Sequence, residues 1–231
     1  MGGGMSIEMW RAEDGEEALR GALQERVFEE FTWEPVLDPS KLQVTVADHG
    51  VILTGTVQCY PEKVAAERAA GRVRGVQRVE NELIVVPRDL PADGAIAKAA
   101  RAALAADALI GQFPIAVGVR GGWVELAGEV STAAARRAAE GVAGRLAGVT
   151  GVTNAIIVRP GPATADLEER VDQALERCGS GIARHITVET HGNTAVARGH
   201  TRSLEERDRA LRAVWDVPGI GSVVDQIVVA E

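Results

Sequence analysis

The pattern of apolar and polar residues repeats three times along the chain. Residues 44–86, 117–158 and 188–229 each contain two stretches in which every second residue is apolar, a segment with apolar residues three and four apart, and a final alternating stretch. Alternation predicts β-strands with one buried face, and the wider spacing predicts an amphipathic helix. With a helix ahead of each strand pair, every copy is predicted to be an αββαβ module, and the fold class is α+β.

The first helix of the first module is predicted over residues 16–30. Asp14 and Glu17 form a capping-box pattern that favours a helix start at this point. Residues 1–15 are therefore expected to form a flexible arm. One face of the helix is predicted to be buried, since apolar residues recur one turn apart at Leu19, Leu23 and Val27.

A β-hairpin and a second helix follow. Apolar residues alternate over residues 42–46 and again over 51–53, with turn-forming residues at 48–50 between them. Pro61 suits the first turn of a helix, where its missing N–H is not needed. A narrow stripe of small or branched residues is expected to pack this second helix on the sheet in every module: Ala66, Ala69, Ala70 and Val73; Ala139, Val142, Ala143 and Leu146; Ala210, Ala213, Val214 and Val217.

Three positions recur at fixed spacing. The first is a glycine near the end of the strand pair, interpreted as a tight-turn residue: Gly55, Gly128 and Gly199. The second, twenty residues later, is a glycine predicted to end the second helix in a left-handed turn: Gly75, Gly148 and Gly219. The third is a polar residue expected to start the last strand: Asn81, Asn154 and Asp225.

The helix between the second and third strands predicts that these strands are parallel and that both helices cover one face of a three-stranded sheet. The modules are predicted at residues 16–87, 93–159 and 166–231. The linkers at 87–92 and 159–163 contain proline, so we expect semi-rigid spacers. A domain of this size buries little surface alone, and the modules are therefore expected to pack on one another.

Composition and charge narrow the possible functions. The 231 residues are 46% hydrophobic and carry a net charge of −8, with no apolar run long enough to cross a bilayer. Residues 16–87 and 166–231 each carry −4, residues 1–15 carry −2, and residues 93–159 carry +2. The acidic total argues against nucleic-acid binding. The first residues lack the basic region and apolar core of a secretory signal, which predicts a cytoplasmic protein, or a periplasmic one if a signal has been removed.

The residue pattern resembles the BON domain (bacterial OsmY and nodulation). The likeness lies in residues 48–55 (DHGVILTG), the Ala- and Glu-rich helix that follows, Gly75-Val76, and Asn81 ahead of the last strand. It covers all three modules; the third departs most, with residues 192–195 (GNTA) in its hairpin and Asp225 in place of asparagine. The resemblance implies non-enzymatic modules linked to osmotic and envelope stress that bind phospholipid or membrane surfaces. A relative with an added LysM domain binds potassium, and this sequence shows no LysM-like segment.

Phospholipid is therefore the first candidate ligand. The module with positive charge places basic residues near apolar ones in the sequence, a combination that suits an anionic membrane surface. The alternative is that these residues pack against the flanking acidic modules. The candidate contacts are Lys98, Arg101, Leu109, Ile110, Phe113, Trp123, Arg136, Arg137 and Arg145.

Two further functions stay open. One hypothesis is that backbone carbonyls around Gly75, Gly148 and Gly219 coordinate K⁺, with ordinary helix-end turns as the alternative. The other hypothesis is that the open sheet faces bind a protein partner or a second copy of the chain.

The sequence shows no enzyme motif. Neither GxSxG nor a phosphate-binding glycine motif is present, so no catalytic site is predicted. Cys59 and Cys178 lack metal-ligand spacing and are predicted to be buried or half-buried free thiols. His185, His191 and His200 cluster in the third module without an acidic or cysteine partner, so a structural role is favoured over a metal site.

Overall fold

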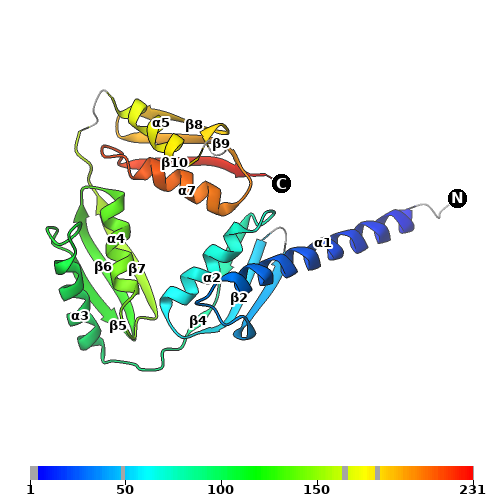
Figure 1. Cartoon of the computed structure of the whole chain (residues 1–231), viewed down its shortest axis with the longest axis horizontal. Helices are drawn as coiled ribbons and strands as arrows, with labels where there is room; N and C mark the ends of the chain where they lie inside the picture. The colour runs from blue at the N-terminus through cyan, green and yellow to red at the C-terminus, as the bar shows by residue number, and fades with distance from the viewer. Residues whose placement is uncertain (1–4, 48–49, 163–165, 180–182, 231) are drawn as a thin grey trace.

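The computed structural model describes residues 5–47, 50–162, 166–179 and 183–230, with side-chain surroundings given from residue 17 onward. The chain forms three αββαβ modules, each with its own sheet and its own hydrophobic core (Figure 1). The predicted fold class is confirmed. In the described residues no helix is both long enough and apolar enough to cross a membrane.

Module one begins with a helix longer than predicted. Its elements are α1 (Met5–Trp33), a 3₁₀ turn η1 (Pro39–Lys41), β1 (Leu42–Ala47), β2 (Gly50–Val57), α2 (Tyr60–Arg72), β3 (Arg78–Asn81) and β4 (Ile84–Val85). The flexible arm predicted for residues 1–15 is wrong from residue 5 onward, because this segment contains good helix formers and no proline. The capping box at Asp14 consequently lies inside the helix.

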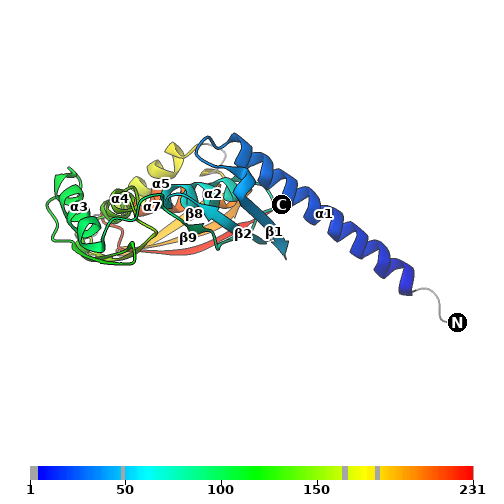
Figure 2. The ribbon, with the colours of Figure 1, turned by 90° about the horizontal axis from the view of Figure 1, so that it is seen from below.

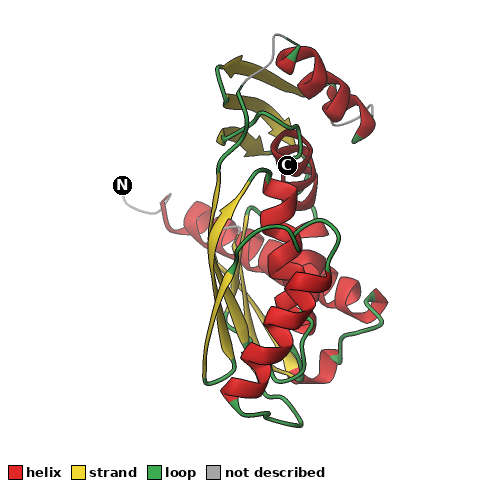
Figure 3. Cartoon of the chain, turned by 90° about the vertical axis from the view of Figure 1, so that its left-hand side faces the viewer, coloured by secondary structure: helices red, strands yellow, loops and turns green. Residues whose placement is uncertain are grey.

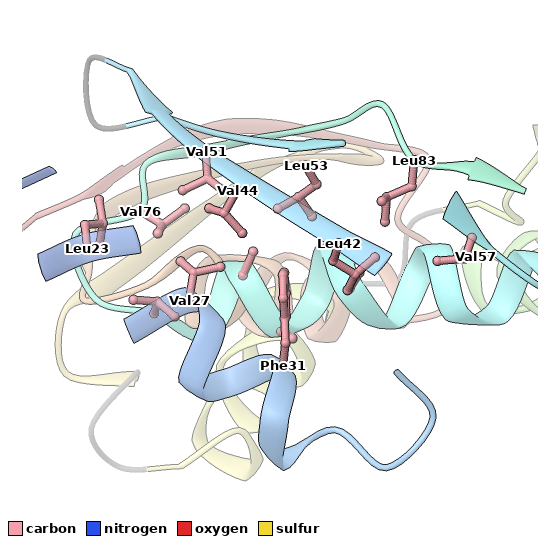
Figure 4. Packing of buried hydrophobic residues seen from close by; sticks show 14 residues of the cluster. Leu23, Val27, Phe31, Leu42, Val44, Val51, Leu53, Val57, Val76 and Leu83 are labelled. Atoms are coloured by element: carbon pink, nitrogen blue, oxygen red, sulfur yellow. The ribbon is translucent and has the colours of Figure 1, made fainter. Parts of the chain in front are cut away.

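The C-terminal half of α1 packs against the core of module one. Leu23, Val27 and Phe31 are buried, and in Figure 4 they point into the core beneath the sheet. Leu19 is exposed, so its predicted place in the apolar row is wrong. The earlier part of α1 runs away from the modules (Figure 2). Arg72 of α2 bonds Glu30 at 3.0 Å and Glu34 at 3.2 Å, which fastens the two helices together.

Modules two and three repeat the plan. Module two comprises α3 (Asp93–Ala106), β5 (Ala116–Arg120), β6 (Trp123–Val130), α4 (Ala133–Gly144) and β7 (Gly151–Val158). Module three comprises α5 (Leu167–Arg177), β8 (Ile186–His191), β9 (Thr194–Thr201), α7 (Leu204–Trp215) and β10 (Ser222–Val229). In every module the first two strands are antiparallel and the last lies parallel to the second, as predicted.

The second helices pack as their apolar stripes predict. Ala66, Ala69 and Ala70 are fully buried, as are Ala139, Ala143, Ala210 and Val214. The strands of the three modules line one side of the molecule, and the helices, apart from the N-terminal part of α1, line the other (Figure 3). The three open sheet faces therefore point the same way, while α2, α4 and α7 meet near the centre (Figure 1).

The strand glycines have a different role from the one predicted. Gly55 and Gly199 are strand residues paired with Leu42 and Ile186, and Gly128 lies in β6, so none of them forms the hairpin turn. Their φ angles are 121°, 138° and 150°. A Cβ at Gly199 would overlap the carbonyl oxygen of His185, the residue directly before the neighbouring strand β8. Close approach of the backbones, not a turn, therefore requires glycine.

The polar residue of each last strand also lies elsewhere than predicted. β7 and β10 each begin three residues before Asn154 and Asp225, and Asn81 ends β3. The predicted hairpin turn at 48–49 in module one falls outside the described residues. The recurrent polar residue is thus internal to the strand in modules two and three and the last strand residue in module one. In all three modules its side chain bonds to the second helix.

Candidate functional site at the junction of three helices

The nine residues proposed for lipid contact do not share one surface. Lys98 and Arg101 lie on α3, whereas Trp123 lies on the outer face of the sheet, where its indole N–H donates to Thr153 at 2.8 Å. Ile110 is fully buried, so its assignment as a surface contact is wrong. Phe113 packs against the core of module two, whereas Leu109 is exposed.

Three of the nine residues face the other modules. Arg136, Arg137 and Arg145 lie on or directly after α4 and line clefts between module two and its neighbours. Arg137 forms an ion pair with Asp216 of module three. Arg136 donates to the carbonyl oxygen of Asn154 at 3.1 Å. For Arg137, packing against an acidic neighbour is therefore the observed arrangement.

Three clefts meet where α2, α4 and α7 converge. The cleft between modules one and two has a volume of about 330 Å³, that between two and three about 310 Å³, and that between three and one about 750 Å³. Glu140 lines all three clefts. Four further charged residues each line two of them. We call these five residues the junction cluster: Arg68, Arg137, Glu140, Asp208 and Arg212.

The junction cluster contains three cations, one from each module, and two anions. The Nε–H of Arg212 donates a hydrogen bond to the backbone carbonyl oxygen of Asp208, at 3.2 Å. The guanidinium of Arg68 makes no hydrogen bond to the other residues that the structure describes, although its charge acts on Asp208. The guanidinium groups of Arg68 and Arg212 are thus the ones best placed to accept an external anion.

The pKa shifts show that the clefts are partly shielded from water. Desolvation raises the pKa of Asp208, although Arg212, Arg207 and Arg68 act in the opposite direction. Burial also raises the pKa of Tyr60, with a smaller contribution from the charge of Glu140. Reduced access to water strengthens the attraction between an arginine and a bound anion.

Sequence reasoning missed Arg68 and Arg212 because it searched for basic residues within one module. A signal was present, since both residues occupy the same position of the repeat, thirteen residues after the strand glycine. Gly141 occupies that position in module two. Aligning the second helices and assuming that they face one another would have found both arginines.

The helix-end glycines form the turns that the sequence predicts. Gly75, Gly148 and Gly219 have φ angles of 89°, 81° and 109°, which only glycine adopts readily. Nearby carbonyl oxygens are already in use, since Asn193 donates to that of Gly219 and Arg26 donates to that of Arg74.

The cysteines and histidines do not build a chemical site. Cys59 and Cys178 are half-buried free thiols, as predicted, and burial raises the pKa of both. The rings of His185 and His200 lie 4.6 Å apart, whereas His191 lies at the other end of β8. Within the described residues no group of three or more His, Cys, Asp or Glu side chains could hold a metal ion.

Comparison with known proteins gives a clear result at the level of the family. Two solved structures of CdsD, a structural protein of the type III secretion system of Chlamydia trachomatis, are each 14% identical and cover 90% of this chain. The match covers 91% of one CdsD chain and 98% of the other, which is the C-terminal domain. The TM-scores are 0.24 and 0.25, too low to support an argument about how the modules are arranged. No curated protein matches the sequence. The model of the BON domain matches residues 20–87, 92–160 and 163–231, and the chain therefore belongs to the BON domain family.

Proposed function

We propose that this protein is a non-catalytic binding protein that associates with anionic phospholipid through the junction cluster. The observation that carries the proposal is the convergence of Arg68, Arg137 and Arg212 from three modules on shared clefts. Guanidinium groups bind phosphate oxygens through paired, charge-assisted hydrogen bonds. The site thus selects a phosphate group, which every phospholipid headgroup supplies.

Family membership supports this choice. BON domains are known for membrane or phospholipid binding and for stress-related roles, and the family is generally non-catalytic. Apolar and aromatic side chains accompany the arginines, since Tyr60, Val64 and Trp215 line the same clefts. This combination of cations and apolar surface was expected within module two alone. Here it is assembled from all three modules.

Vesicle flotation tests the proposal with the full chain. Vesicles of phosphatidylglycerol mixed with phosphatidylcholine are expected to bind the protein at low salt and to release it at high salt. The variant Arg68→Gln/Arg212→Gln removes two cations, each worth about 1 kcal/mol near a charged surface, so binding should fall by about 30-fold. The matched control is Arg159→Gln/Arg198→Gln, because these arginines pair with Glu129 and Glu189 on the sheet side.

Soluble phosphates separate the lipid from a free ligand. If glycerol phosphate at matched ionic strength raises the melting temperature of the wild type but vesicles do not bind, the ligand is a soluble phosphate and the membrane role is wrong. If the protein fails to float at low salt and phosphate has no effect beyond that of chloride, the site binds no phosphate. Equal losses of vesicle binding in the two double variants would mean that binding depends on the net charge of the protein and not on the junction cluster.

A protein-docking role is the second candidate, and it is favoured by a different surface. An exposed aliphatic residue recurs at the same position of each last strand: Ile84, Ile157 and Val228, with 63%, 55% and 64% of their surface exposed. Each directly follows a buried residue of its module, namely Leu83, Ile156 and Ile227, and therefore lies on the opposite, open face of the sheet. Scattered apolar residues among paired charges suit a protein surface better than an anionic membrane. Strictly monomeric mass in light scattering up to high concentration would count against self-association.

A further inference from the structure

The three modules are joined by contacts that use equivalent positions of the repeat. The first residue of each second helix lies five residues after the strand glycine; these residues are Tyr60, Ala133 and Leu204. A residue near the end of the same helix lies sixteen residues after that glycine; these residues are Gly71, Gly144 and Trp215. We call the contact between the first set on one module and the second set on the next a joint.

Joint one connects module one to module two. The ring of Tyr60, at the start of α2, lies against Gly144, at the end of α4. A Cβ at Gly144 would lie 2.8 Å from Cδ1 of Tyr60, closer than two carbon atoms can pack. Tyr60 also packs against the hydrophobic core of module two. A large side chain here fits because its partner has none.

Joint three connects module three to module one in the same way. Leu204, at the start of α7, packs against the core of module one, and a Cβ at Gly71 would lie 3.6 Å from Cβ of Leu204. Neither Gly71 nor Gly144 has a positive φ, so these positions do not need glycine for backbone reasons. The ring of Tyr60 excludes any side chain at Gly144, whereas at Gly71 a Cβ would make an ordinary contact with Leu204 and only a larger side chain is excluded.

Joint two connects module two to module three with the sizes reversed. Ala133, at the start of α4, and Trp215, at the end of α7, line the same cleft. Here the small residue belongs to the start of one helix and the large residue to the end of the other. The ion pair between Arg137 and Asp216 crosses the same joint. In Figure 1 the three helices accordingly follow one another, start to end, around a triangle.

We infer that size matching at the three joints holds the chain in a closed ring of modules and determines which module docks on which. Every joint pairs a large residue with a small one, in direct contact at joints one and three and across a shared cleft at joint two. Which of the two positions is large differs among the joints. In the other circular order Tyr60 would face Trp215, which leaves no room for both rings, and Ala133 would face Gly71, which leaves a gap. Of the possible pairings, the observed circular order is the one that matches a large residue with a small one at every joint.

The test converts one joint into the type found at another. Gly144→Trp places a large side chain against Tyr60 and is expected to open joint one, which increases the radius of gyration in small-angle scattering. Adding Tyr60→Ala recreates the Ala and Trp pair of joint two, so Tyr60→Ala/Gly144→Trp should scatter like the wild type. The control is Gly21→Trp on α1, where an added Cβ meets nothing within 4 Å.

Each outcome decides the matter. Compact scattering from Gly144→Trp alone overturns the inference, because the joint would then tolerate two large residues. Failure of the double variant to recover the wild-type radius also overturns it, whether the single variant expands or unfolds, with folding followed by circular dichroism. Expansion of the single variant and recovery in the double variant support it. The same result is expected for Gly71→Trp and Leu204→Ala/Gly71→Trp at joint three.

Discussion

Modules one and two fasten the last strand to the second helix with an asparagine. The amide of Asn81 donates to the carbonyl oxygen of Lys63 at 2.8 Å and to Glu67 at 3.2 Å. Asn154 repeats both bonds, to the carbonyl oxygen of Arg136 at 2.8 Å and to Glu140 at 3.1 Å. An amide is needed because both partners are acceptors.

Module three makes the same connection with opposite chemistry. Asp225 accepts two hydrogen bonds from the guanidinium of Arg207, one of them at 2.8 Å from Nε, and Leu211 stands where the other modules have glutamate. Each of the three side chains also accepts the N–H of the residue two positions later, at 3.3, 3.3 and 2.9 Å. The contact between strand and helix is thus retained by a coordinated change of partners, and Asp225 does not signal a weaker fold.

The largest expected effect concerns the strand glycines, which also differ among the modules. A Cβ at Gly199 would overlap the carbonyl oxygen of His185, whereas one at Gly128 would lie 2.7 Å from that of Pro114. Gly199→Ala should therefore destabilise module three by about 3 kcal/mol or more, and Gly128→Ala should cost module two less. Calorimetry measures both. Negligible losses would show that the strands separate at no cost, and equal losses would show that the distance to the neighbouring carbonyl oxygen does not determine the cost.

Exchanging the anchor residues is expected to have the next largest effect. Asn154→Asp places a carboxylate beside Glu140 and the carbonyl oxygen of Arg136, which leaves acceptors facing one another and should cost about 2 kcal/mol. Asp225→Asn should cost about 1 kcal/mol, because Arg207 keeps an oxygen partner but loses the charge. Urea denaturation measures the losses. A larger loss from Asp225→Asn would mean that the ion pair, and not the acceptor clash, dominates.

A smaller effect is expected from Asp208, which occupies the position of Val64 and Arg137 in the other modules. Desolvation raises its folded-state pKa above the unfolded value of about 3.8, so the folded state binds the proton more tightly. The resulting stability is present at low pH and is lost as the pH rises through the raised pKa. Asp208→Asn should therefore increase the melting temperature near pH 7 and flatten its pH dependence above pH 4, unlike Asp172→Asn on α5.

The fold was predictable from the sequence because period and spacing determine it. The stripe at Ala66, Ala69 and Ala70 and the turn at Gly75 are local features, and the structure confirms them. The role of Gly55 was not predictable from spacing, since it depends on how closely a neighbouring strand approaches. The junction cluster was missed for a related reason. The cluster depends on how the three modules face one another, and no local sequence pattern predicts that arrangement.

The smallest effect is expected from potassium. Coordination of K⁺ needs several free carbonyl oxygens at one point, but Asn193 already donates to the carbonyl of Gly219, and Arg26 donates to that of Arg74. Melting curves in potassium chloride and sodium chloride at equal ionic strength should therefore coincide. A bound ion stabilises the folded state by mass action, so a rise of more than about 1 °C in potassium alone would contradict this expectation. The variant Asn193→Ala would then locate the site. Because it frees the carbonyl of Gly219, it should enlarge the potassium effect if the ion binds in module three and leave it unchanged if the ion binds at Gly75 or Gly148.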